Sequence, residues 1–154
     1  LYFDVAVSPD LIRDHAQMPP LAIPPSDTDK WASQMQAGLT EMTIRCSQLP
    51  HWDIIVQNDE GVKCRDVFEA IHRSLTLRLT SQEQQKHIKA QDRSKVEEAF
   101  QKRCRDIPLQ KNVALREGFL RVDLLKGQRI FMGLTRPPDG GDYWWLHLGL
   151  PKSH

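Results

Sequence analysis

Residues 65–79 read RDVFEAIHRSLTLRL, the strongest helical pattern in the chain. The apolar residues Val67, Ile71 and Leu75 recur every four positions, with Phe68 beside them and charged residues between. This spacing places the apolar side chains on one face of an α-helix. The stretch therefore predicts an amphipathic helix with that face packed against a core.

Two more helices are expected after this one. Residues 80–83 read TSQE, a capping-box pattern that starts a helix. Ile88 is the one apolar residue of that second segment, so it should lie at the surface. Asp92 is placed to cap a third helix. The apolar residues of this third helix follow a helical spacing: Val96, Ala99, Phe100 and Cys104.

Strand patterns precede the helical block. Residues 1–7 alternate apolar with other side chains, as a half-buried strand does. Residues 41–47 alternate in the same way, and residues 52–57 are rich in β-forming residues. Only four residues separate these last two runs. They therefore predict an antiparallel hairpin.

Strand patterns return after the helices. Residues 119–125 alternate, with Leu120 and Val122 on one side, and residues 126–128 have the composition of a tight hairpin connection. Residues 130–134 and 144–148 predict two further strands. The order of strands, helices and strands is typical of an α+β fold.

We expect residues 1–154 to form one domain, a mainly antiparallel sheet with two or three helices from residues 65–105 on one face. Residues 18–40 contain two Pro pairs and predict a surface loop with a possible short helix around Trp31. The chain starts at Leu1 instead of Met, so we expect an upstream segment.

Composition narrows the function classes. The chain has 21 basic and 20 acidic residues, so no global charge draws it to nucleic acid or an anionic membrane. No apolar run approaches the roughly 20 residues that span a bilayer. The three cysteines are widely spaced and odd in number, which favours free thiols in a reducing, intracellular compartment, cytoplasmic or nuclear.

Several short segments together resemble a family of uncharacterised fungal domains that is abundant in mushroom-forming species. The segments are 1–5 (LYFDV), 49–56 (LPHWDIIV), 66–71 (DVFEAI), 121–125 (RVDLL) and 131–134 (FMGL). Ala99 and Phe100 followed by Arg103, and the closing Trp-x-Leu at 144–146, also fit. His51 and the stretch 29–38 look like additions to the pattern. The resemblance implies one domain and implies no activity.

A small hydrolase-like site is one hypothesis for function. Arg121 and Asp123 lie two residues apart on the predicted strand and so share one face, where His147 could join them. The alternative is that this face is simply solvated. Cys64 precedes a helix, where a thiol pKa can fall, although a packing role is the other interpretation. The scattered histidines share no metal-binding spacing, so we expect no metal and no cofactor.

Nucleic-acid binding is the weaker alternative. Basic side chains gather along the helical block, among them Lys86, Lys89, Arg93, Lys102 and Arg103. Such a patch could contact phosphates. No recognition-helix or stacking motif accompanies it, and a solvated helix surface is the default interpretation.

Aromatic residues supply the leading hypothesis, a non-catalytic domain that binds a protein or a small ligand. Trp144 and Trp145 should point to opposite faces of the last strand, next to Tyr143 and a Pro- and Gly-rich loop. With Trp31 they form the candidate partner-binding set. Neither the partner nor the oligomeric state follows from the sequence.

Overall fold

A computed structural model gives the structure of the chain and describes residues 2–11, 13–14, 21–22, 39–107 and 118–151. The elements in chain order are η1 (Pro9–Leu11), β1 (Arg13–Asp14), β2 (Leu21–Ala22), β3 (Glu41–Arg45), β4 (Ile54–Gln57), α2 (Cys64–Leu75), α3 (Ser81–His87), η2 (Ala90–Asp92), α4 (Arg93–Asp106), η4 (Arg121–Leu125), β5 (Ile130–Thr135) and β6 (Trp144–Gly149). Here η marks a 3₁₀ helix. Trp31 and most of the predicted loop 18–40 lie outside the described residues.

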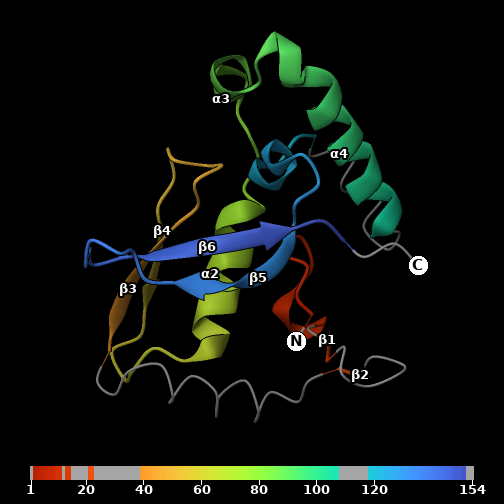
Figure 1. Cartoon of the computed structure of the whole chain (residues 1–154). Helices are drawn as coiled ribbons and strands as arrows, with labels where there is room; N and C mark the ends of the chain where they lie inside the picture. The colour runs from red at the N-terminus through yellow and green to blue at the C-terminus, as the bar shows by residue number, and fades with distance from the viewer. Residues whose placement is uncertain (1, 12, 15–20, 23–38, 108–117, 152–154) are drawn as a thin grey trace.

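The main sheet is mixed, with the strand order β4-β3-β6-β5 (Figure 1). The predicted hairpin of β3 and β4 is confirmed, and β5 pairs with β6 in the same antiparallel way. β3 and β6, however, run parallel. The sheet is therefore mixed and not purely antiparallel, although two of the three pairings among its described strands are antiparallel as expected. The long helical crossover after β4 permits this parallel pairing, which no short turn can make.

Helix α2 covers one face of the sheet, as its apolar stripe predicts. Val67, Phe68 and Ile71 are buried in the main core. The alternate strand residues Met42, Ile44 and Val56 meet them from the sheet. Figure 1 shows α2 crossing behind β5 and β6. The opposite face of the sheet presents the other set of strand residues.

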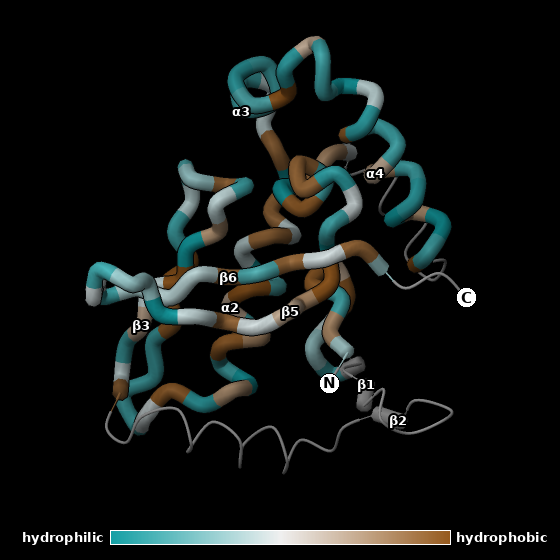
Figure 2. Tube along the Cα trace, in the orientation of Figure 1, coloured by the Kyte–Doolittle hydropathy of each residue, from teal (hydrophilic) through white to brown (hydrophobic). Residues whose placement is uncertain are grey.

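α3 and α4 do not lie on the sheet, contrary to expectation. Among the described elements α4 packs on η4, and α3 buries none of its residues. Leu79, Ile88 and Val96 form a second, smaller core beside the main one. In Figure 2 both helices are largely hydrophilic and stand at one end of the molecule. Their few apolar residues suffice for a small satellite core but not for covering a sheet.

The predicted strand at 119–125 is wrong. Residues 121–125 form η4, and Lys126 follows in the left-handed conformation with φ 56°. The carboxylate of Asp123 accepts a hydrogen bond from the Leu120 amide at 2.9 Å, which closes the turn. The connection at 126–128 therefore joins a 3₁₀ helix to β5 and is not a hairpin.

The N-terminal segment, residues 2–7, packs along the start of β5 instead of forming the predicted strand. An isolated bridge joins Asp4 to Ile130, with Phe131 N donating to Phe3 O at 2.8 Å and Val5 N donating to Arg129 O at 2.9 Å. The buried guanidinium of Arg129 bonds Asp4 at 2.7 Å and Asp106 at 2.6 Å. These contacts tie the start of the chain to β5 and to the end of α4.

Candidate binding cleft

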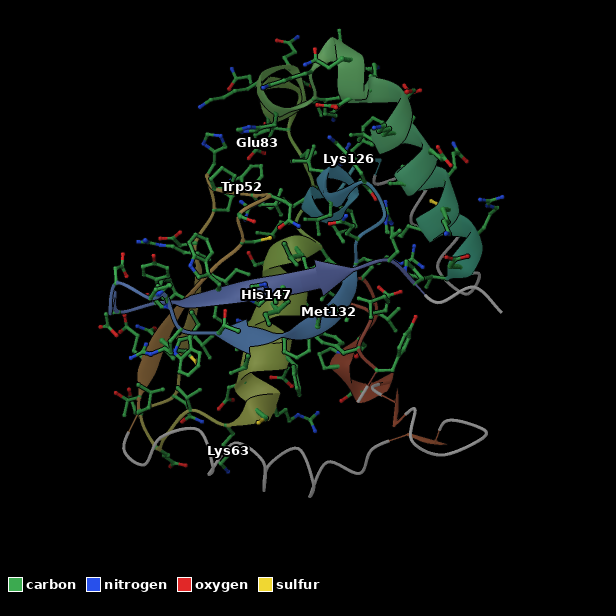
Figure 3. The ribbon with its side chains drawn as sticks, viewed as in Figure 1. Trp52, Lys63, Glu83, Lys126, Met132 and His147 are labelled. Carbon is green, nitrogen blue, oxygen red and sulfur yellow. The ribbon has the colours of Figure 1, made fainter. Side chains whose placement is uncertain are left out.

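A cleft of about 200 Å³ opens between the β3–β4 turn, the α3–η2 segment and the end of η4. The second core closes its floor through Val96 and Leu124. Figure 3 labels Trp52, Glu83 and Lys126 around this end of the molecule. The lining residues are Gln48, Leu49, Pro50, His51, Trp52, Lys86, His87, Lys89, Asp92, Val96, Leu124 and Lys126.

One wall of the cleft is aromatic. The centroid of the His87 ring lies 4.6 Å from that of His51 and 4.8 Å from that of Trp52. The Arg121 guanidinium lies over the Trp52 ring at 4.4 Å from its centroid, within the range of a cation–π contact. The tight β3–β4 turn holds this wall in place, because Leu49 is buried beneath it in the main core.

The other side of the cleft is cationic. Lys86 and Lys89 come from the α3–η2 segment, and Lys126 comes from the end of η4. The carboxylate of Asp92 also lines the cleft and pairs with the Lys126 ammonium at 3.0 Å. Within the described part of the chain, no ion pair engages Lys86 or Lys89. Three ammonium groups and one carboxylate leave the cleft with a formal charge of +2.

Burial and neighbouring charges shift the pKa values of two titratable groups at the rim. Burial, the neighbouring His51 and Lys86 lower the pKa of His87, although Glu83 opposes the shift. Burial also lowers the pKa of the Arg121 guanidinium, again against Glu83. The lowered pKa favours the neutral form of the His87 imidazole.

The residues of the predicted basic surface lie in different places in the structure. Lys86 and Lys89 reach the cleft, whereas Lys102 is exposed on α4 and Arg93 pairs with Glu97 at 3.2 Å. Arg103 is only 4% exposed. Contrary to the prediction, Arg103 is therefore not part of an exposed surface that could contact phosphates.

Arg103 instead forms a buried ion pair with Asp123. The guanidinium donates to both carboxylate oxygens, at 2.8 and 3.0 Å, and also to the Gly118 carbonyl at 3.3 Å. Two parallel hydrogen bonds of this kind are the strongest geometry for the pair. The pair joins α4 to η4, so its role is structural.

The three hydrolase candidates have different partners. Arg121 stacks on Trp52, Asp123 is held by Arg103, and His147 Nε2 lies 2.6 Å from the Thr135 hydroxyl on the exposed sheet face. A 3₁₀ helix turns once every three residues, so positions 121 and 123 point in different directions. The expected shared face does not exist, because it required a strand.

The aromatic candidates alternate as predicted. Trp144 packs against the main core under the Arg136 guanidinium, 4.8 Å from the Trp144 ring centroid. Trp145 is on the opposite face with Tyr143, their ring centroids 5.3 Å apart, and Arg45 covers Tyr143 at 4.4 Å. Exposed Met132 and His147 share the open face, as Figure 3 shows. Much of this aromatic surface is already in contact with arginines.

The cysteines behave as packing residues. All three are free, and Cys46 and Cys104 are buried. Burial raises the pKa of the half-buried Cys64 thiol, which is the reverse of an activated thiolate. Among the described residues no three His, Cys, Asp or Glu side chains gather as a metal site. No described helix is long and apolar enough to cross a membrane.

Sequence reasoning missed the cleft itself. Its histidines, Trp52 and Lys126 come from separate turns and helix ends, and none of these segments carries a motif. The one local signal was an unusual turn, Pro50-His51-Trp52, in which two large rings follow a Pro.

The segments around the cleft carry no recognisable motif, and the comparisons with known proteins are consistent with this. No curated protein and no solved structure matches the chain. A family model does match, over residues 1–141, and is described as a family of unknown function (DUF6699). The match covers nearly the whole chain, including every element around the cleft, and ends before β6. The chain therefore belongs to this family of unknown function.

Proposed function

We propose that the protein is a non-catalytic binding domain whose cleft takes an anionic group carried by a partner. The observation that carries the proposal is the convergence of Lys86, Lys89 and Lys126 on one cleft of about 200 Å³ with a single carboxylate among them. Like charges held close together raise the free energy of the empty cleft, and a bound anion relieves it.

The size of the cleft indicates what it can hold. Pockets that enclose a drug-sized ligand measure roughly 300–1,000 Å³. This cleft is smaller, so it suits one charged group of a larger partner, with the remainder of the partner outside. Contacts beyond the cleft would then supply most of the affinity.

The two alternatives have less support. A hydrolase would need Arg121, Asp123 and His147 together, and each has its own partner. A nucleic-acid surface along α4 could not use Arg103, because its guanidinium is buried in the ion pair with Asp123. An intracellular setting fits the three free cysteines, and a fungal source is what the resemblance implies.

Lys86→Gln with Lys89→Gln is expected to weaken binding of a fluorescein-labelled acidic peptide by about tenfold, since each substitution removes one charge-assisted contact. Fluorescence anisotropy at low and high salt measures the effect, which should shrink as salt screens the charges.

The matched control is Lys95→Gln with Lys102→Gln, which removes the same charge from exposed positions of α4 outside the cleft. It should leave the affinity nearly unchanged. An equal loss in both double variants would mean that net charge, and not the cleft, attracts the peptide. Absence of binding by the unmodified chain to any acidic or phosphorylated peptide would end the proposal.

A further inference from the structure

We infer that the anionic group is a phosphate monoester in its doubly charged form, held by Lys86, Lys89 and Lys126 with the His87 imidazole as an added donor. This inference rests on the proposed function and narrows it to one ligand chemistry. Its support comes from the charge of the cleft, the kind of donors present and the place of His87.

The charge of the cleft matches a dianion. Lys126 and Asp92 neutralise each other at 3.0 Å, so Lys86 and Lys89 contribute two uncompensated positive charges. A carboxylate of an acidic peptide would offset only one of them. A phosphate monoester carries about −1.5 to −2 at neutral pH and offsets both.

The donors suit a tetrahedral group. The lining residues include lysines and histidines from three sides and no arginine. Lysine ammonium groups act as point charges that can meet phosphate oxygens from several directions, so a phosphate site does not require the planar fork of arginine. Three acceptor oxygens can meet ammonium groups that arrive from α3, the start of η2 and the end of η4.

His87 makes the cleft sensitive to pH. The charged groups that act on its ring are His51 from the β3–β4 turn and Glu83 and Lys86 from α3. Lys89, Asp92 and Lys126 line the same cleft, and Arg121 lies over Trp52. Burial lowers its pKa, and His51 and Lys86 add to that effect against Glu83. A dianion would offset the repulsion, so binding should draw a proton onto His87 and strengthen as the pH falls.

The Trp52 ring gives a reason to expect a phosphorylated side chain in preference to a nucleotide. The Arg121 guanidinium covers the ring at 4.4 Å, and His87 packs against it at 4.8 Å. Nucleotides are commonly held by stacking of the base on an open aromatic face. Here the ring is already engaged by protein groups.

Calorimetric titration of the whole chain with three peptides tests the inference, the peptides differing only in serine, glutamate or phosphoserine at the central position. We expect the phosphoserine peptide to bind about tenfold more tightly than the glutamate peptide. Lys86→Gln and Lys89→Gln should each remove most of this preference, and Lys95→Gln should not. Adenosine monophosphate serves as the nucleotide arm and should bind more weakly than the phosphoserine peptide.

Binding measurements with inorganic sulfate and with phosphate distinguish protonation of the protein from protonation of the ligand. Sulfate stays doubly charged, so its affinity should rise steadily from about pH 8 to about pH 5.5 as His87 gains a proton. Phosphate should instead weaken again below its second pKa of about 6. His87→Gln should flatten the rise seen with sulfate.

The outcomes separate this inference from the proposed function. Equal affinity for the glutamate and phosphoserine peptides would overturn the phosphate assignment and leave an anion-binding domain. Tighter binding of adenosine monophosphate than of the phosphoserine peptide would overturn the assignment to a phosphorylated side chain. Absence of binding by every anion would overturn both.

Discussion

Asp123→Ala is expected to lower the free energy of unfolding by about 3–5 kcal/mol. The substitution leaves the Arg103 guanidinium buried without its counter-ion, in a side chain only 5% exposed. It also removes the acceptor for the Leu120 amide, which starts η4. Urea unfolding of the variant beside the unmodified chain measures the loss.

A double substitution controls for the origin of this effect. Arg103→Met with Asp123→Leu removes both charges and replaces them with apolar volume, so it should be clearly less destabilising than Asp123→Ala alone. A loss below about 1 kcal/mol for Asp123→Ala would contradict the buried pair, since exposed ion pairs contribute no more than that.

Phe3→Ala should cost about 3–5 kcal/mol, the usual loss for a fully buried Phe. Phe3 is 1% exposed, and its ring centroid lies 5.2 Å from that of Phe68 and 6.1 Å from that of Phe131. It thus joins the N-terminal segment to α2 and to β5. Thermal and urea unfolding both report the change.

Phe3→Leu is the matched control and should cost much less, because most of the volume remains in place. If Phe3→Ala unfolded at the same urea concentration as the unmodified chain, the N-terminal segment would not be part of the core. The description of residues 2–7 as a segment packed against β5 would then be wrong.

The elements that the sequence predicts correctly are those with local signals. α2 follows from its apolar stripe, and α3 starts at the predicted capping box, in which Thr80 Oγ1 accepts from Glu83 N at 3.1 Å. The β3–β4 hairpin follows from alternation and a short turn. Each of these patterns depends on neighbours within a few residues, so one chain suffices to see them.

The errors come from contacts that are distant in sequence. Leu120, Val122 and Leu124 alternate like a strand, yet the buried Arg103–Asp123 pair and the cap at Leu120 hold this segment as a 3₁₀ helix. The parallel pairing of β3 with β6 likewise joins segments separated by the whole helical block. Hydrophobic periodicity contains no information about either contact.

The sequence indicates only some of the residues of the candidate site. Lys86, Lys89 and Arg121 were each singled out, but for a helical patch and for a strand face. Their meeting with His51, Trp52 and Lys126 depends on where α3 stands beside the β3–β4 turn.

The location of the anion site is the central claim, and the four tryptophan indole N–H signals of the ¹⁵N-labelled chain test it directly. Titration with the phosphoserine peptide should shift the signal of Trp52 and leave those of Trp144 and Trp145 in place, with single Trp→Phe variants assigning each signal. Movement of the Trp144 and Trp145 signals with a stationary Trp52 signal would contradict the account, because binding would then take place at the β5–β6 end of the sheet and not in the cleft.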